Sequence, residues 1–154
     1  RGELALIEPP DWYPALYYLN QAYRLQKNDT AAKTLAVIFF NLGTSFKKAG
    51  DRRHAIARLE QATTYDTAFV KAFNLLGALY HETGRLKQAQ RCYLRTVALD
   101  PGYAMAWFNL GALAWRQDDF YRAAGYFKRA VESAPGNDYF REWYQKALAR
   151  AGEH

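Results

Sequence analysis

The sequence predicts an all-α fold built from antiparallel helix pairs, and three observations support this. A set of residue types recurs every 34 positions in three consecutive copies. Within each copy the apolar residues are spaced three and four apart, as on one face of a helix. A short turn containing Gly or Asp interrupts each copy midway. Each copy is therefore expected to form a helix, a tight turn and a second helix.

Two columns of the repeat hold only small residues. Glycine in the first helix of each copy indicates that a second helix approaches closely there. The glycine column is Gly43, Gly77 and Gly111, and the alanine column is Ala55, Ala89 and Ala123. Three further columns are large and apolar: Phe39, Phe73 and Trp107; Leu42, Leu76 and Leu110; Leu59, Tyr93 and Phe127.

Turn residues mark the helix ends. The midway breaks are Ala49-Gly50-Asp51, Thr83-Gly84-Arg85 and Gln117-Asp118-Asp119. Each copy then closes on Asp66-Thr67, Asp100-Pro101 or Ala134-Pro135. The two Asp residues at these closing positions are predicted to cap the next helix, with Pro at its first position in the later copies.

These columns resemble the tetratricopeptide repeat family over roughly two thirds of the chain. The middle copy matches the family signature at Phe73, Leu76, Gly77, Tyr80, Ala89, Tyr93 and Pro101. It departs at Thr96, where the family usually has Ala; the first copy has Thr67 in place of Pro, and the third has Ala114 in place of the second aromatic. The resemblance implies a right-handed α-solenoid whose first helices line a concave groove.

The expected organisation is a single domain over residues 1–154. It comprises an N-terminal extension and helix (1–35), three repeats (36–69, 70–103 and 104–137) and a capping helix (138–154). The N-terminal helix is expected from about Asp11 to Lys27, either covering the first repeat or remaining from an earlier one. The capping helix is expected from about Asp138 to Ala151, with a polar outer side formed by Arg141, Gln145, Arg150 and Glu153.

The candidate binding site is the stripe of each first helix that the resemblance turns toward the groove. This stripe combines small residues, Asn side chains that donate and accept hydrogen bonds, basic residues and apolar anchors. Its members are Phe40, Asn41, Thr44, Lys48, Lys71, Asn74, Leu75, Ala78, His81, Phe108, Asn109, Ala112, Trp115 and Arg116. A plainer interpretation stays open: the Asn and Lys side chains are only solvated, and Phe40 and Phe108 pack between repeats.

The predicted function is a non-enzymatic scaffold that binds an extended peptide or a partner segment with acidic groups or apolar anchors. Some family members hold chaperone C-termini through a clamp of Lys and Asn side chains. This sequence departs from that pattern, because Phe40 and Thr44 stand where the first inner helix should offer Lys and Asn. When the register is shifted by one repeat, Asn41 and Lys71 match the clamp, but Leu75 replaces the basic residue that it needs.

Catalytic, metal-binding and cofactor motifs are not found in the sequence. His81-Glu82 begins like a helical zinc motif, but Arg85 stands where the second His is needed. The other histidines, His54 and His154, belong to no cluster with metal-ligand spacing. Cys92 is interpreted as a structural or surface thiol. No enzyme activity, cofactor or metal is expected.

Charge and composition leave alternatives open. The net charge of +6 and pI of about 9.4 come from dispersed basic residues, which argues against a concentrated nucleic-acid patch. No apolar run is long enough to span a membrane. One cysteine favours a reducing compartment such as the cytoplasm, whereas the start at Arg1 leaves a longer chain and a removed targeting segment open.

The alternative function is self-assembly or docking in a complex through exposed aromatics near the ends: Trp12, Tyr13, Tyr139, Phe140 and Trp143.

Overall fold

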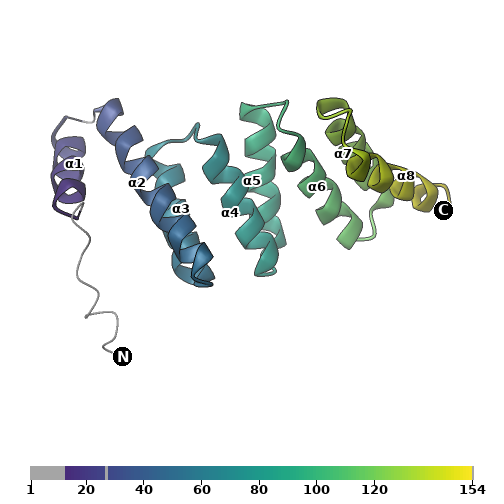
Figure 1. Ribbon diagram of the computed structural model, residues 1–154, viewed down its shortest axis with the longest axis horizontal. Helices are drawn as coiled ribbons and strands as arrows, with labels where there is room; N and C mark the ends of the chain where they lie inside the picture. Colours follow the sequence, from purple (N-terminus) through teal and green to yellow (C-terminus); the bar gives the residue numbers. More distant parts are fainter. Residues whose placement is uncertain (1–12, 27, 154) are drawn as a thin grey trace. The chain divides into compact units, whose positions relative to one another are not determined.

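The computed structural model describes residues 13–26 and 28–153, and within these ranges the chain is all-α, with eight helices and no strand (Figure 1). The helices are α1 (Tyr13–Gln26), α2 (Asp29–Lys48), α3 (Arg52–Tyr65), α4 (Val70–Glu82), α5 (Leu86–Leu99), α6 (Ala104–Arg116), α7 (Phe120–Ser133) and α8 (Asp138–Gly152). None of these helices is both long and apolar enough to cross a bilayer. The chain forms two compact units, residues 1–67 with α1 to α3 and residues 68–154 with α4 to α8, and each is described separately.

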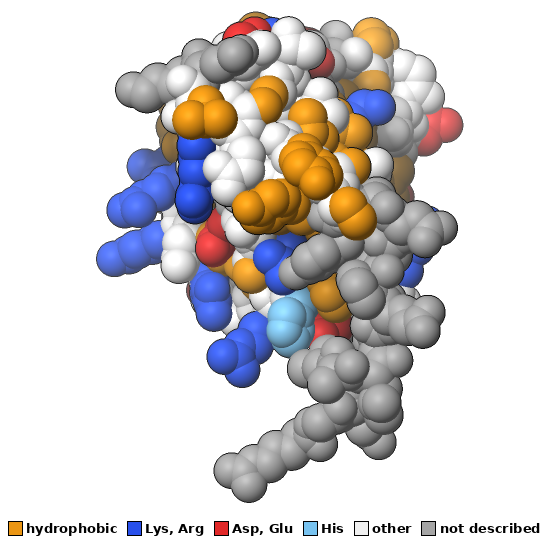
Figure 2. Space-filling model, turned by 90° about the vertical axis from the view of Figure 1, so that its left-hand side faces the viewer, with side chains coloured by type: hydrophobic (Ala, Val, Ile, Leu, Met, Phe, Trp, Pro, Cys, Tyr) orange, Lys and Arg blue, Asp and Glu red, His pale blue; other side chains and the backbone are white. Residues whose placement is uncertain are grey.

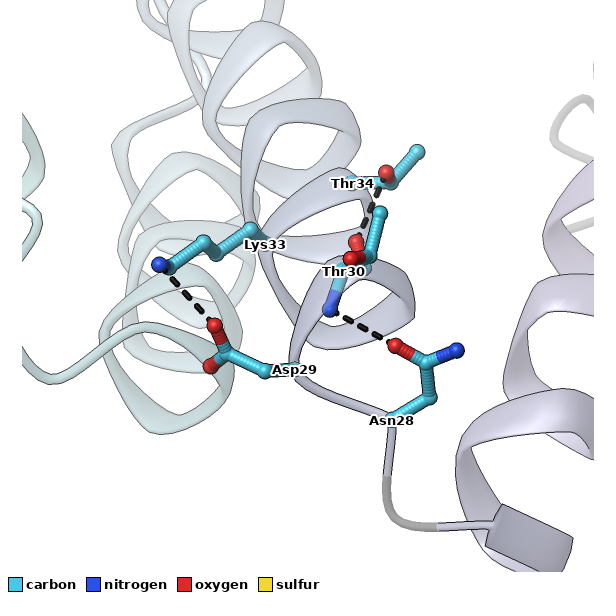
Figure 3. Close-up of polar contacts among 5 residues, drawn as sticks. All are labelled: Asn28, Asp29, Thr30, Lys33 and Thr34. Carbon is cyan, nitrogen blue, oxygen red and sulfur yellow. Dashed lines mark hydrogen bonds and ion pairs between the residues drawn. The ribbon is translucent and has the colours of Figure 1, made fainter.

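Helix α2, the first helix of repeat 1, begins earlier than the repeat pattern predicts. Helix α2 starts at Asp29, ahead of the expected repeat boundary at residue 36. The Oδ1 atom of Asn28 accepts a hydrogen bond from the backbone N–H of Thr30 at 2.9 Å, so Asn28 is the N-cap of α2 (Figure 3). Asp29 lies in the first turn, where a carboxylate is favoured by the helix dipole, and pairs with Lys33 at 2.9 Å.

Helix α1 packs on the helix pair α2–α3 within unit 1. The rings of Tyr23 on α1 and Tyr65 on α3 meet edge to face, with centroids 5.2 Å apart. Tyr65 also stacks on Phe39 of α2 at 5.6 Å, and its hydroxyl donates to Asn20 Oδ1 at 3.4 Å. The N-terminal helix therefore covers the first repeat, one of the two roles predicted for it. Its expected ends at Asp11 and Lys27 lie outside the described residues.

Unit 1 also exposes large apolar side chains. Apolar side chains gather on the face of the molecule seen in Figure 2, with Lys and Arg side chains along one edge. Among the described residues of unit 1, the exposed large apolar side chains are Tyr17, Tyr18, Leu25 and Val37.

The glycine column has the same surroundings in all three copies. Each glycine of a first helix faces the large residue of the second helix in its own pair: Gly43 faces Leu59, Gly77 faces Tyr93, and Gly111 faces Phe127. A Cβ atom at these glycines would lie 2.7, 2.7 and 2.5 Å from the nearest atom of that residue. The alanine column is fully buried in every copy. The repeat inferred from the sequence is thus confirmed as a repeat of packing.

The midway turns are also equivalent. Gly50 (φ 81°), Gly84 (φ 79°) and Asp118 (φ 58°) all adopt left-handed backbone conformations. In each copy the next residue donates its N–H back to the carbonyl five positions earlier, as Arg85 does to Tyr80 at 2.8 Å. Asp119 then caps α7 by accepting from the backbone N–H of Arg122 at 3.0 Å.

The helix starts predicted at the end of the first two copies are wrong. Helices α4 and α6 begin at Val70 and Ala104, and the preceding Asp66 and Asp100 are the C-terminal boundary residues of α3 and α5. The Oδ1 atom of Asp100 accepts from the N–H of Gly102 at 3.1 Å. Its side chain therefore closes a local turn and does not cap the next helix.

Helix α8 closes unit 2 with an apolar inner side and a polar outer side. Phe140 is only 3% exposed, so its predicted place on an exposed aromatic surface is wrong. It is buried because its ring stacks on Phe108 of α6 at 5.0 Å. Trp143 is half-buried and Tyr139 exposed, whereas Trp12 and the side chain of Tyr13 lie outside the described residues. The predicted outer residues Arg141, Gln145, Arg150 and Glu153 are all exposed, as expected.

Candidate functional site

A pocket of about 340 Å³ lies where α4, α5 and α6 meet in unit 2. Helix α4 and helix α6 start 34 residues apart, so equivalent columns of the two first helices face the same side. Four of the lining residues belong to the predicted stripe, and Glu82 and Tyr93 add to them. The lining residues are Ala78, His81, Glu82, Tyr93, Asn109 and Arg116.

Two amide side chains connect the first helices next to this pocket. Asn109 on α6 donates from Nδ2 to Oδ1 of Asn74 on α4, and the two atoms are 3.5 Å apart. This distance is at the outer limit for a hydrogen bond, so the contact is weak. Both residues are half-buried. Their amides keep further donor and acceptor positions available to a ligand.

His81 is a residue of this pocket whose pKa is shifted by its charged neighbours as well as by burial. Burial lowers the pKa of His81, the nearby charge of Arg116 lowers it further, and Glu82 opposes both effects. His81 is therefore held toward its neutral form, in which one ring nitrogen accepts and the other donates. Arg116 is exposed at the last position of α6, where it presents a guanidinium to solvent.

Tyr93 is a lining residue that the sequence interpretation assigned only to the core. Its side chain is 1% exposed, and burial raises the pKa of its hydroxyl, with Cys92 and Glu82 adding to the effect. Its column holds Leu59 and Phe127 in the other copies, so Tyr93 is the one member with a polar atom. This hydroxyl, which the equivalent residues lack, was the feature of the sequence that could have indicated Tyr93 as a lining residue.

The two predicted aromatic anchors of α6 contact the capping helix. Phe108 lies among Phe127, Phe140 and Trp143, with centroid distances of 5.2, 5.0 and 6.5 Å. Trp115 meets Trp143 edge to face at 5.3 Å. Phe108 and Trp115 therefore form the junction between α6 and α8, and both remain half-buried.

The other predicted residues of unit 2 do not line this pocket. Lys71 is exposed in the first turn of α4, and Leu75 and Ala112 are half-buried on α4 and α6. Lys71 adds positive charge to the same helix, since it precedes Asn74 by one turn of α4.

The predicted stripe of unit 1 lies on α2. Asn41 lines a pocket of about 160 Å³ together with Ile38, Leu42 and Ser45. The hydroxyl of Thr44 donates to the carbonyl of Phe40 at 2.9 Å, so it is engaged within its own helix. Phe40 and Thr44 are half-buried, and Lys48 is exposed at the end of α2.

Among residues 13–26 and 28–153, no three His, Cys, Asp or Glu side chains lie together as a metal site would require. Cys92 is buried on α5. The polar groups of the described pocket are suited to hydrogen bonding and charge pairing with a ligand.

Comparison with known proteins identifies the repeat. The tetratricopeptide repeat family model matches residues 40–89 and 82–138. Human tetratricopeptide repeat protein 6 is 26% identical over 113 residues, which are 73% of this chain and 20% of that protein. The probable UDP-N-acetylglucosamine--peptide N-acetylglucosaminyltransferase SPINDLY of Oryza sativa subsp. japonica is 35% identical over 63 residues, 41% of this chain and 7% of that protein. The chain thus spans a fifth or less of the length of these relatives.

Solved structures share the fold. The first tetratricopeptide repeat domain of Spaghetti, bound to the HSP90 peptide SRMEEVD, superposes with a TM-score of 0.73 at 18% identity. This match covers 78% of this chain and 95% of that domain. The family model spans more than half of the sequence, and the three glycine environments repeat as its period requires. The chain belongs to the tetratricopeptide repeat family.

Proposed function

We propose that this chain is a non-enzymatic protein-interaction scaffold that binds an extended peptide along the first-helix face of α4 and α6. The observation that carries the proposal is the pocket beside the Asn74–Asn109 contact, lined by His81, Asn109 and Arg116. An extended peptide presents one backbone donor and one acceptor per residue. Asparagine amides match both groups, and neutral histidine can do the same.

The weak contact between the two amides favours ligand entry. At 3.5 Å, the Asn109–Asn74 hydrogen bond contributes little, so a peptide that replaces it with shorter bonds gains free energy. Both side chains are half-buried, which limits the rotamer entropy lost on binding. The pocket is therefore suited to hold a peptide backbone.

The charges of the pocket favour an acidic ligand side chain. Arg116 is exposed on α6, and a guanidinium pairs with a carboxylate through two parallel hydrogen bonds. Lys71 on the same face supports this preference. Glu82 also lines the pocket, and its negative charge repels a peptide with several adjacent carboxylates at this position.

The likeness to the Spaghetti domain, whose structure holds an HSP90 peptide, supports protein interaction as the general class of function. The ligand we propose differs from that peptide. Phe40 and Thr44 occupy the positions where the chaperone clamp needs Lys and Asn, and Leu75 replaces a basic residue. We expect SRMEEVD to bind more weakly than a peptide selected on this chain.

The test is selection of ligands from a displayed library of unstructured 12-residue peptides, followed by fluorescence polarisation. Asn109→Ala is expected to weaken the selected peptide about 10-fold, because one or two hydrogen bonds of about 1 kcal/mol each are lost. Asn74→Ala and Arg116→Ala should also weaken it. Arg91→Ala, an exposed change on the second helix α5, serves as the matched control.

Two results would reject the proposal. One is a library that yields no ligand above the background of an unrelated helical protein. The other is a selected ligand whose affinity is the same for wild type, Asn109→Ala and Arg116→Ala. The same assay on Asn41→Ala and Lys71→Ala tests the other predicted members of the stripe.

A further inference from the structure

The two second helices of unit 2, α5 and α7, lie side by side. Gln90 of α5 lines the same small pocket as Arg122 and Tyr126 of α7. The two helices begin 34 residues apart, at Leu86 and Phe120, so equivalent positions of the repeat lie at the same level of both. Their exposed faces therefore form one continuous surface of unit 2.

This surface is lined with basic side chains. Its exposed basic residues are Lys87, Arg91 and Arg95 on α5 and Arg122 and Arg129 on α7. Helix α5 contains no Asp or Glu, and α7 contains only Glu132. The five basic residues and Leu94 of α5 together make up the α5–α7 surface. Tyr121 and Lys128 are not part of it, because they line the side of α7 toward α8.

Like charges are close together on this surface. Lys87, Arg91 and Arg95 follow one another at intervals of four residues, so they lie on one face of α5. Positive charges at this spacing repel each other and destabilise a helix. Asp119 pairs with Arg122 at 3.6 Å, but the pair is at the surface and contributes little. Binding of an acidic ligand would therefore reduce the repulsion.

Two of the arginines are held over aromatic rings at equivalent positions of the repeat. The Cζ atom of Arg95 lies 5.9 Å from the ring centroid of Phe73, and that of Arg129 lies 4.8 Å from the ring centroid of Trp107. The second pair follows the first by 34 residues, whereas the first copy has Gln61 in place of the arginine. A guanidinium stacked on a ring is restricted in orientation, so it loses less entropy when it binds a carboxylate through two hydrogen bonds.

Leu94 indicates the kind of anionic ligand. Its side chain is 41% exposed, and it lies between Arg91 and Arg95 on the same face of α5. A protein segment with an apolar residue between acidic residues would bury Leu94 while its carboxylates bind the arginines. Single-stranded nucleic acid is instead held by stacking of its bases on exposed aromatic rings. Tyr126 is half-buried and its ring stacks on Trp107 at 6.2 Å, so it offers no such platform.

We infer that the α5–α7 surface binds an extended acidic segment of a partner protein, with one apolar residue set between its carboxylates. The carboxylates pair with arginines of both helices, Arg91 and Arg129 among them, and the apolar side chain packs on Leu94. The α5–α7 surface shares no residue with the pocket between α4 and α6. This interaction is therefore additional to the peptide binding proposed above.

The test uses fluorescein-labelled peptides and fluorescence polarisation with the full chain. The first peptide is Glu-Asp-Glu-Leu-Glu-Asp-Glu, and the second has Ser in place of Leu. The adjacent carboxylates of both peptides suit this test, because Glu82 repels them from the α4–α6 pocket. The first peptide is expected to bind, and the second to bind about 3-fold more weakly because it cannot bury Leu94. Added NaCl should weaken both, since exposed charges are screened.

Variants of the surface place the binding. Arg91→Ala and Arg129→Ala should each weaken the first peptide about 5-fold, because each removes a charge-assisted hydrogen bond. Arg141→Ala on α8 is the matched control, since it removes the same charge from an exposed position elsewhere in unit 2. Circular dichroism verifies that the helical fold persists in all three. Asn109→Ala, which should weaken the α4–α6 ligand, is expected to leave the first peptide unaffected.

A charge exchange adds a gain of binding, which a damaged fold could not produce. The double variant Arg91→Glu/Arg129→Glu should lose the first peptide. It should instead bind the peptide Lys-Arg-Lys-Leu-Lys-Arg-Lys, which the wild type is expected not to bind.

Four outcomes would overturn the inference. One is the absence of binding by the first peptide at low salt. Another is equal weakening by Arg91→Ala and Arg141→Ala, because net charge alone would then explain the binding. A third is equal affinity for the Leu and Ser peptides. The fourth is tighter binding of a labelled oligouridine that Arg91→Ala and Arg129→Ala weaken, because the ligand would then be a nucleic acid. A library-selected ligand that Asn109→Ala does not affect would bear only on the peptide-binding proposal.

Discussion

Gly111 on α6 lies directly against the ring of Phe127 on α7, and a Cβ at Gly111 would be only 2.5 Å from Phe127 Cδ1. Phe127 is fully buried, so its ring has little room to move away. This contact fixes how closely the two helices of the third repeat approach. It also sets the position of α6, which carries Asn109 and Arg116 of the candidate site.

Gly111→Ala is therefore expected to lower the free energy of unfolding by about 1–3 kcal/mol, the usual cost of overpacking a core. Gly125→Ala is the matched control, because no atom lies within 4 Å of a Cβ at that position on α7. The control should raise the free energy of unfolding by roughly 0.5–1 kcal/mol through helix propensity. Urea titration measures both. Equal stability of Gly111→Ala and wild type would contradict the close packing.

The midway turns provide a second prediction, based on backbone conformation. Asp118 has φ 58°, a left-handed conformation that glycine adopts without the cost of a Cβ. Asp118→Gly is expected to raise the free energy of unfolding by about 0.5–1 kcal/mol, and Gly84→Asp to lower it by a similar amount. The two variants make opposite changes at equivalent positions. Thermal unfolding that shifts both in the same direction would argue against the equivalence.

A third prediction concerns the pH dependence of stability. The pKa of His81 in the folded protein lies below its ordinary value of 6.5, chiefly because the side chain is buried and also because Arg116 is near. The unfolded chain therefore takes up a proton first as the pH falls through about 6.5. The free energy of unfolding should decrease from that pH down to the folded-state pKa and then stop changing on account of this residue.

Variants separate the contribution of His81 from that of other groups. His81→Asn should remove this component of the pH dependence, and Arg116→Gln should reduce it by removing a charge that opposes protonation. NMR titration of the His81 ring would follow its pKa directly. A pKa of His81 above 6.5, or one that falls further in Arg116→Gln, would show that the assigned causes are wrong.

Much of the fold could be predicted from the sequence, because three copies of the repeat carry the same residue types at equivalent positions. The glycine column, the midway turns and the capping helix were all predicted and are confirmed, since each depends on local spacing or on a column of one residue type. The early start of α2 at Asp29 was missed as a repeat boundary, because its first seven residues precede the first repeat and follow no column.

Other errors have a physical origin in tertiary contacts. An Asp before Pro is compatible both with a helix start and with a local turn. Asp100 forms the turn, because its Oδ1 atom accepts a hydrogen bond from the backbone N–H of Gly102. Phe140 could not be recognised as buried before its partner Phe108 was known to face it. For the candidate site, the columns predicted which residues share a face, but only the structure places Asn74 beside Asn109.

The most direct test of the proposed function follows the side-chain amides of Asn74 and Asn109 by NMR while a library-selected peptide is titrated to saturation. The account predicts that these two NH₂ signals shift together with the backbone amides of α4 and α6 that surround His81 and Arg116. Saturation that leaves both side-chain amides unchanged, with shifts confined to the outer surfaces of α5 and α7, would contradict it.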